Sequence, residues 1–317
     1  MDEFELIRRF FERQARGDGV LIGIGDDGAV VAPAPDRKLV AVVDTLVAGV
    51  HYPAGFPASD IGYRALAVNL SDVAAMGGTP RWMTLALTLP EADAAWLADF
   101  AGGLFEAASE YDVALIGGDT TRGAQTVISV QLLGDVREDA IMTRSGAKPG
   151  DAIYVTGTVG DAAGGLELLK TAASDDDNAG FLISRFARPS ARVYFGAGIA
   201  GIATAAIDLS DGLGTDLEKI LRASAVAGTI DIENLPVSPQ LRRALGEDRA
   251  SELALYGGDD YELCFSAKST DETRIAELAS EHDVRVTRIG EVSGGAGLTC
   301  MKAGKRVPYR DRGYRHF

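Results

Sequence analysis

The chain is poor in the side chains that bind soft metals or form disulfides. Its 317 residues include two cysteines, Cys264 and Cys300, and three histidines. The cysteines form no CxxC pair, so no disulfide framework is indicated. Cys264 lies in an apolar run and is expected to be a small buried hydrophobe. With so few thiol and imidazole ligands, a zinc site is not favoured.

Positive charge is also scarce. Lys and Arg number 31 against 46 Asp and Glu, which gives a net charge of -15. Nucleic acid and anionic membranes are therefore disfavoured as partners, because both attract clustered cations. No apolar stretch approaches membrane-spanning length. The acidic start of the chain lacks the basic region of a signal peptide, so we expect a cytoplasmic protein.

Several nucleotide-binding motifs are missing. The sequence contains no G-x-x-x-x-G-K-[ST] and no protein-kinase set of H-R-D and D-F-G. The run Gly23 to Gly28 does read G-x-G-x-x-G. However, Asp26 and Asp27 would face the pyrophosphate, and the following Ala29 to Pro33 reads as a strand instead of a helix. We therefore reject a dinucleotide site.

What the sequence does have is aspartate at the ends of apolar runs, six times over, and in five of the six runs an aspartate lies beside glycine or serine. If these carboxylates converge, they repel one another unless cations neutralise them. Hard oxygen ligands suit Mg²⁺, which completes its shell with substrate phosphates and water. Metal-dependent phosphate chemistry is expected. The six runs contain Asp26-Asp27, Asp44, Asp72, Asp119, Asp208-Asp211 and Asp259-Asp260.

Structural roles compete with the ligand interpretation in the first half of the chain. Asp26 and Asp27 suit a tight turn as well as a metal. Asp44 closes an apolar run, where a carboxylate needs a partner. Asp72 is expected within a helix, on one face with Asn69, and we favour a ligand role. Asp119 follows two glycines at an expected strand end, where open α/β sheets bind ligands.

In the second half the competing role is helix capping. Ser210 and Asp211 are expected to cap the helix that follows, and a phosphate could bind at the same helix N-terminus. Arg144 and Lys148 are positive charges near the expected domain junction. They suit either a solvated linker or a phosphate clamp.

Periodicity predicts a mixed α/β (α+β) chain of two domains, residues 1–140 and 141–317. A solvated loop is expected over 171–180. The expected helices are 3–13, about 59–76, 92–111, 181–187, 190–203 and one carrying Leu213, Leu217, Ile220 and Leu221, and the expected strands are 21–24, 28–32, 39–43, 83–89, 113–116, 127–133, 152–156 and 205–209.

In order and over nearly the whole chain, the motifs resemble those of thiamine-monophosphate kinases, a family within the aminoimidazole-ribonucleotide-synthetase-like superfamily. The segments that carry the resemblance are Gly25–Asp27, Asp44–His51, Ala67–Gly77, Gly117–Gly123, Thr143–Asp151, Ile207–Leu213 and Gly258–Leu263.

The resemblance implies ATP-dependent phosphorylation of thiamine monophosphate to thiamine diphosphate, with several Mg²⁺ ions. It also implies a homodimer in which the sheet of the N-terminal domain, the metal- and ATP-binding domain, pairs with that of a second subunit into a barrel. The C-terminal domain would be α+β. The metal ligands that the resemblance implies are Asp27, Val43, Asp44, Asp72, Asp119, Asp208 and Asp211. The residues implied to contact ATP are Gly118, Asp119, Arg144 and Ser210, and those implied to contact thiamine phosphate are His51, Asp259 and Asp311. The implied catalytic residues are Asp44, Asp72, Asp119 and Arg144.

The chain departs from the family pattern at three places. Val42 and Val43 replace hydroxyl residues before Asp44, so only backbone carbonyls could bind metal there. Asp259 replaces a glutamate. Asp311 stands where an aromatic residue usually stacks on the thiamine ring, and Tyr309 or Tyr314 could substitute. Two alternatives stay open: a related ATP-dependent ribonucleotide cyclase and a non-catalytic module that binds divalent metals.

Overall fold

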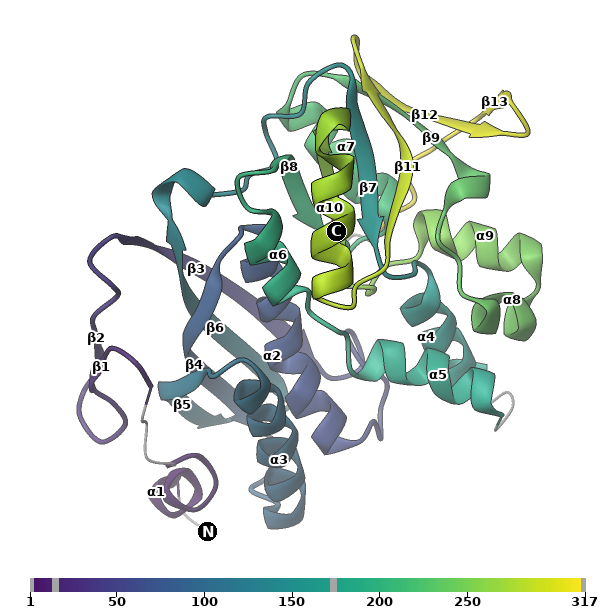
Figure 1. The fold of residues 1–317 in the computed structure, drawn as a ribbon. Helices are drawn as coiled ribbons and strands as arrows, with labels where there is room; N and C mark the ends of the chain where they lie inside the picture. The colour runs from purple at the N-terminus through teal and green to yellow at the C-terminus, as the bar shows by residue number, and fades with distance from the viewer. Residues whose placement is uncertain (1–2, 13–16, 172–175, 315–317) are drawn as a thin grey trace. The chain divides into compact units, whose positions relative to one another are not determined.

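The computed structural model describes residues 3–12, 17–171 and 176–314. The chain divides into two compact units, one of residues 1–73 and 78–138 and the other of residues 74–77 and 139–317. Helices and strands alternate in both (Figure 1). The mixed α/β class expected from the sequence is confirmed.

The first unit is built on a four-stranded sheet in the order β3-β6-β4-β5. β6 is antiparallel to both β3 and β4, and β5 is parallel to β4. Helices α2 and α3 cover one face of this sheet (Figure 1). The bounds are β3 Arg37–Val47, α2 Ala58–Ala75, β4 Thr79–Leu89, α3 Ala94–Glu110, β5 Ala114–Arg122 and β6 Val127–Arg137.

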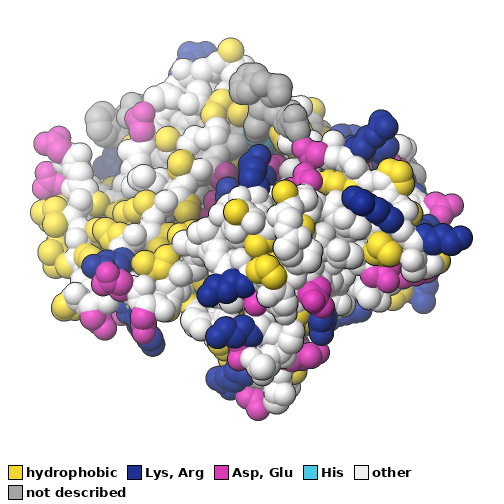
Figure 2. All heavy atoms as spheres, turned by 90° about the horizontal axis from the view of Figure 1, so that it is seen from above, with side chains coloured by type: hydrophobic (Ala, Val, Ile, Leu, Met, Phe, Trp, Pro, Cys, Tyr) yellow, Lys and Arg dark blue, Asp and Glu magenta, His cyan; other side chains and the backbone are white. Residues whose placement is uncertain are grey.

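Burial alternates along β3 because only one face of the sheet is covered. Val40 and Leu46 are buried, whereas Leu39 is 51% exposed and Val43 is 62% exposed. Val43 is paired with Gln131 of β6, which is also exposed. Hydrophobic side chains gather at the left of Figure 2, on the side where Figure 1 places β1 to β3. The open face is therefore partly apolar.

Helices α2 and α3 pack closely because each contributes a glycine to the contact. A Cβ on Gly62 would lie 2.0 Å from the carbonyl oxygen of Phe100, and one on Gly103 would lie 1.8 Å from that of Ser59. Asp93 starts α3 by accepting hydrogen bonds from the backbone N–H of Ala95 and Trp96. The helix predicted over 92–111 is thus confirmed, with a defined cap.

The N-terminal segment differs from its prediction in detail. The expected helix over 3–13 is a turn of α-helix, α1 (Glu3–Leu6), that continues as a π-helix, η1 (Ile7–Phe11), and residue 13 lies outside the described residues. β1 (Val20–Ile22) and β2 (Val30–Val31) pair antiparallel. The strand expected after the G-x-G-x-x-G run is confirmed as β2, and the rejection of a dinucleotide site stays a prediction.

The second unit contains a seven-stranded sheet in the order β13-β12-β9-β11-β7-β10-β8. Among the strands that the structure describes in this sheet, β9 and β12 are parallel and the other neighbours are antiparallel. The bounds are β7 Asp151–Thr156, β8 Ala203–Asp208, β9 Ala227–Asp231, β10 Leu263–Lys268, β11 Val286–Ser293, β12 Gly297–Lys302 and β13 Lys305–Val307, with helices α4 Asp161–Thr171, α5 Asp177–Ala187, α6 Val193–Ile199, α7 Leu213–Ala223, α8 Pro239–Leu245, α9 Glu247–Tyr256 and α10 Glu272–Glu281, and short 3-10 turns η2 Glu138–Ala140, η3 Ile232–Asn234 and η4 Ser269–Asp271.

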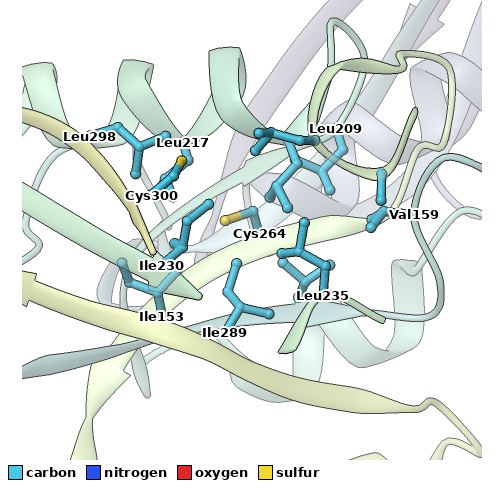
Figure 3. Close-up of a cluster of buried hydrophobic side chains, with 14 of the residues drawn as sticks. Ile153, Val159, Leu209, Leu217, Ile230, Leu235, Cys264, Ile289, Leu298 and Cys300 are labelled. Atoms are coloured by element: carbon cyan, nitrogen blue, oxygen red, sulfur yellow. The ribbon is translucent and has the colours of Figure 1, made fainter. Parts of the chain in front are cut away.

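The core of this unit joins the sheet to helix α7 (Figure 3). All four residues of the predicted apolar face of α7 are buried: Leu213, Leu217, Ile220 and Leu221. Cys264 lies in the same cluster, as expected, and burial raises the pKa of its thiol. An apolar stripe at helical spacing thus correctly predicted which side of α7 is buried.

Some predicted boundaries are wrong. The loop expected over 171–180 is shorter, because Asp176 caps α5 by accepting from the N–H of Ala179, while residues 172–175 lie outside the described ones. The helix expected over 190–203 is limited to α6. Asp44 and Asp119 lie inside strands β3 and β5, not at strand ends. Among the described residues, no helix combines the length and apolarity needed to span a bilayer.

Candidate active site

In the first unit, a pocket of about 570 Å³ brings together two of the predicted segments. The loop from Gly23 to Ala29 forms one part of its lining, and Ile116 to Thr120 of β5 form another. Asp27, Gly118 and Asp119 therefore share one pocket. Asp26 also lines it, and its carboxylate accepts a hydrogen bond from the N–H of Asp27 at 3.0 Å. The turn role and a ligand role for this segment are compatible.

Gly118 is required by close packing between neighbouring strands. A Cβ at this position would lie 2.0 Å from the carbonyl oxygen of Leu85 on β4. Gly118 is also exposed and lines the pocket, so its backbone is accessible to a ligand. The sequence pattern Gly117-Gly118-Asp119 thus places an accessible backbone next to a carboxylate.

Asp44 lies away from this pocket. It is half-buried on β3 and pairs with the buried Val130, so it lies on the helix-covered face of the sheet. Burial raises the pKa of its carboxyl group, and the charge of Arg64, a buried residue of α2, opposes that rise. Arg64 is thus a cation that sequence reasoning missed.

The strand order separates two of the predicted metal ligands. Asp44 is on β3 and Asp119 on β5, and these strands form opposite edges of the sheet. Three strand spacings amount to about 14 Å. The register also places Asp119 opposite Ala86, on the other face from Asp44. The expected convergence of all the carboxylates is therefore not found within this unit.

Asp72 is half-buried on α2, one turn from the fully buried Asn69. The amide nitrogen of Asn69 donates to the carbonyl oxygen of Ala65 at 3.0 Å. Its side-chain oxygen has no hydrogen-bond partner among the described residues. A buried oxygen acceptor without a donor suits a hard cation or a ligand N–H.

His51 is oriented by the backbone of its own loop. Its Nδ1 accepts a hydrogen bond from the N–H of Val47 at 3.0 Å. In the neutral ring, the proton is therefore on Nε2, which is the atom able to donate to a phosphate.

In the second unit, the predicted residues gather around the start of α7. Asp208 ends β8 and is 5% exposed. The N–H of Asp259 donates to the carbonyl oxygen of Ser210 at 2.9 Å. The N–H of Tyr261 donates to the carbonyl oxygen of Leu209 at the same distance. The end of β8 with Asp208, and the turn with Ser210 and Asp211 that follows it, therefore adjoin the loop that carries Asp259.

The loop that carries Asp259 is strained. Asp259 and Tyr261 have left-handed φ values of 71° and 51°. Such conformations persist only where the surroundings fix them. The buried Asp260 supplies one fixed point, because its carboxylate accepts from the N–H of Gly160 and of Ala162 at the start of α4. Burial raises its pKa well above the ordinary range.

Glu262 supplies the second fixed point. It is fully buried, and its carboxylate accepts hydrogen bonds from Arg185 at 2.6 Å and from Thr156 at 2.7 Å. Arg192 donates two further bonds to it, each 2.6 Å long. Burial alone would raise the pKa of Glu262, but the two arginines hold it below its ordinary value.

The predicted cap of α7 is wrong. The N-cap residue is Gly212, and no side chain caps the helix from that position. Instead, Asp216 within the helix accepts hydrogen bonds from the N–H of Asp211 and of Gly212. These two N–H groups are therefore already engaged, and a phosphate at this helix start would have to use other donors.

The C-terminal segment is anchored to the same helix. Asp311 accepts from the hydroxyl of Thr215 at 2.7 Å and from the N–H of Gly313 at 3.0 Å. The ring of Tyr309 is stacked on Tyr256, with ring centroids 5.9 Å apart. Tyr314 is 51% exposed. Of the two tyrosines considered as substitutes for an aromatic platform, Tyr314 has the more accessible ring.

Arg144 is exposed in the irregular segment before β7. Ser224 at the end of α7 ties this segment down: its hydroxyl donates to the carbonyl oxygen of Arg144 and accepts from the N–H of Gly146 and Ala147. The backbone of Arg144 is thus fixed while its guanidinium is solvent-accessible, as a phosphate clamp requires.

Over the described part of the chain, no group of three or more His, Cys, Asp and Glu side chains is spaced to hold a metal ion. The donor set nevertheless fits Mg²⁺, which is usually bound by one or two carboxylates together with water and substrate phosphates. Asp27 and Asp119 provide such donors together in one pocket, and the side-chain oxygen of Asn69, unpaired among the described residues, is a separate donor on α2.

The sequence analysis did not identify the charged partners of Asp211 and Glu262. Asp216 and Lys219 could have been found from their i, i+3 spacing on a predicted helix. Arg185 and Arg192 are 77 and 70 residues from Glu262, and no local pattern connects them.

Comparisons with known proteins identify both halves of the chain. Residues 25–136 match the N-terminal domain, and residues 148–302 the C-terminal domain, of the AIR synthase related proteins. The thiamine-monophosphate kinase of Salmonella typhimurium is 44% identical over 320 residues, covering 99% of this chain and 98% of that protein. That of Escherichia coli K12 is equally similar.

Solved structures of thiamine-monophosphate kinases are also similar to this chain. The thiamine-monophosphate kinase of Stenotrophomonas maltophilia K279a is 44% identical, with a TM-score of 0.89 over 97% of this chain and 98% of that one. AaThiL, solved in complex with AMPPCP and TMP, is 31% identical, with a TM-score of 0.79 over 99% of this chain and 96% of that one. With the same fold and full-length similarity, the chain belongs to the thiamine-monophosphate kinase family.

Proposed function

We propose that the protein transfers the γ-phosphate of ATP to thiamine monophosphate, giving thiamine diphosphate and ADP. The observation that carries this proposal is the 44% identity to thiamine-monophosphate kinases over 99% of the chain. The relative solved with AMPPCP and TMP supports an ATP-like donor and the phosphorylated acceptor.

In the first unit, carboxylates and backbone would bind metal and nucleotide. The exposed backbone of Gly118 would bind a phosphate, and Asp119 lies next to it in the pocket. His51 would donate from Nε2 to the thiamine phosphate. The proposed Mg²⁺ ligands of this unit are Asp27, the carbonyl of Val43, Asp44, Asp72 and Asp119.

In the second unit, Asp208 and Asp211 would bind Mg²⁺. Ser210 and Arg144 would bind ATP, with Arg144 forming a charge-assisted clamp on phosphate oxygens. Asp259 and Asp311 would contact the thiamine phosphate.

The chemistry requires little from the protein beyond positioning and charge. The acceptor is a phosphate oxygen that is ionised at neutral pH, so no general base is needed. Bound Mg²⁺ ions would supply the positive charge that lets two polyanions meet and that stabilises a loose transition state. We propose direct in-line transfer without a phosphorylated enzyme, in which the side chains named above would orient both substrates.

We further propose that a second copy of the chain covers the open face of the first unit's sheet, giving a homodimer. The exposed Leu39 and Val43 on β3 support this, because an uncovered apolar sheet face favours association. In this proposal, residues 1–140 serve metal and ATP binding as well as dimerisation, and residues 141–317 form the α+β domain.

The test is a coupled assay of ADP release with thiamine monophosphate, with and without Mg²⁺, using unphosphorylated thiamine as the control acceptor. ADP release that needs both thiamine monophosphate and Mg²⁺ would support the proposal. Turnover with formylglycinamidine ribonucleotide instead would indicate the related cyclase. Metal binding without any turnover would indicate the non-catalytic module.

A further inference from the structure

At the start of α7, four groups form a closed ring of hydrogen bonds. Asp216 is fully buried, and one of its carboxylate oxygens accepts from the N–H of Asp211 at 3.0 Å and of Gly212 at 3.2 Å. Its other oxygen accepts from the ammonium of Lys219 at 2.7 Å. The same ammonium donates to Oδ2 of Asp211 at 2.6 Å. The ring thus begins and ends at Asp211.

Each part of the ring fixes a different degree of freedom of Asp211. The bond from its N–H to Asp216 restrains the backbone. The bond from Lys219 restrains the side chain. Gly212 makes the turn possible, because its φ is 116° and a Cβ there would lie 2.7 Å from the carbonyl oxygen of Tyr256. Both the position and the rotamer of Asp211 are therefore determined.

The contact with Lys219 engages only one oxygen of Asp211. Oδ1 accepts no hydrogen bond from the residues described by the structure. The side chains of Asp211 and Lys219 are 30% and 25% exposed, so the carboxylate is accessible from solvent. A carboxylate held through one oxygen can present the other to a cation.

Stability alone does not require this arrangement. A serine or aspartate at the N-cap would satisfy the first N–H groups of α7 with no buried carboxylate. Burying Asp216 is unfavourable unless it is paired, and here its partners are the backbone and the ammonium that hold Asp211. The groups that pair with Asp216 are thus the same groups that fix Asp211.

We propose that Asp216 and Lys219 are positioning residues that hold Asp211 ready to bind a divalent cation through Oδ1. This inference rests on the proposed function, in which Asp211 is an Mg²⁺ ligand. Residues that orient a metal ligand in this way typically contribute about 10- to 100-fold in metal affinity.

The test is a Mn²⁺ titration of the full-length protein, followed by electron paramagnetic resonance, on wild type, Lys219→Met and Lys170→Met. Lys170 is exposed in the last turn of α4, so its variant removes the same charge elsewhere. Lys219→Met should weaken the binding of one Mn²⁺ ion at least about tenfold. Lys170→Met should bind like wild type.

If Lys219→Met binds Mn²⁺ as tightly as wild type, or more tightly, Lys219 does not position a ligand, and the proposal is wrong. A second variant, Lys219→Arg, keeps the charge and should bind Mn²⁺ more tightly than Lys219→Met; equal weakening by both would also contradict the proposal. Thermal melts without metal check that each variant is folded.

The kinase reaction is measured separately on wild type. Absence of phosphorylation of thiamine monophosphate, together with weakened Mn²⁺ binding in Lys219→Met, would overturn the proposed function and leave the positioning role standing.

Discussion

The carboxylate of Asp119 lies in a pocket with Asp27 and next to the exposed backbone of Gly118. A negative charge in that place would repel ATP unless a cation lies between them. Its proposed contribution is therefore electrostatic, and the charge matters more than the shape of the side chain.

Asp119→Asn keeps the shape and removes the charge. We expect kcat/KM for thiamine monophosphate to fall by about 100-fold or more, equivalent to roughly 2.7 kcal/mol of transition-state stabilisation. The matched control is Asp99→Asn, an exposed position on α3. Steady-state ADP release measures both variants. Near-normal turnover in Asp119→Asn would show that its charge is not needed.

Glu262 is a second residue whose charge can be tested, in this case for stability. Its neutral replacement Glu262→Gln leaves Arg185 and Arg192 without their buried counter-ion; their side chains are 12% and 19% exposed. Removing one partner of a buried ion pair typically lowers the free energy of unfolding by about 3–5 kcal/mol. Urea denaturation at neutral pH measures the difference between wild type and variant.

The free energy of unfolding of wild type and of Glu262→Gln should also depend differently on pH. The folded-state pKa of Glu262 is below its ordinary value, because its arginine partners outweigh burial. The stabilisation is thus fully present above the unfolded pKa of about 4.3 and is lost as pH falls through the lower folded value. The stability difference should shrink below about pH 4.3. A constant difference from about pH 3 to 7 would contradict this assignment.

At the scale of elements, the strained loop Gly257 to Glu262 depends on a close approach by the end of β7. A Cβ on Gly157 would lie 2.0 Å from a carboxylate oxygen of Glu262, and the φ of Gly157 is 59°. Gly201 has a φ of 87° and nothing within 4 Å of its Cβ position. An alanine at either position would be strained in its backbone, but an alanine at Gly157 would also overlap with Glu262.

Gly201→Ala should lower the free energy of unfolding by roughly 1–2 kcal/mol, the cost of a left-handed alanine. Gly157→Ala should lower it further and should also weaken thiamine monophosphate binding, because the displaced Glu262 anchors the loop of Asp259. Chemical denaturation and KM measure the two effects. Equal losses of stability in both variants would contradict the role given to this contact.

The sequence predicted those elements whose pattern is local. Helix α7 was predicted from the spacing of Leu213, Leu217 and Ile220, and α3 from a similar stripe. Strand order was not predictable, because pairing between β3 and β6 joins residues 80 to 100 positions apart. Asp44 and Asp119 therefore looked like strand-end neighbours, although they lie at opposite edges of one sheet. The role of Asp216 was not predicted, because this residue accepts the N–H groups at the start of α7 from a position inside the helix.

At the scale of the whole molecule, the proposed homodimer depends on the open face of the first sheet. Leu39→Lys places a charge on that face, where Leu39 is 51% exposed. We expect the molar mass measured by light scattering to fall from that of a dimer to that of a monomer. Ile141→Lys, in the second unit and 42% exposed, is the control and should stay dimeric. A monomeric wild type, or a dimeric Leu39→Lys, would contradict this interface. The cytoplasmic location stays a prediction.

The most direct test of the central claim is phosphorus NMR of the protein with ATP, Mg²⁺ and thiamine monophosphate. We expect the phosphomonoester signal to be replaced by two diphosphate signals, in a one-to-one ratio with the ADP formed. ATP consumption that yields inorganic phosphate, with the thiamine monophosphate signal unchanged, would contradict it.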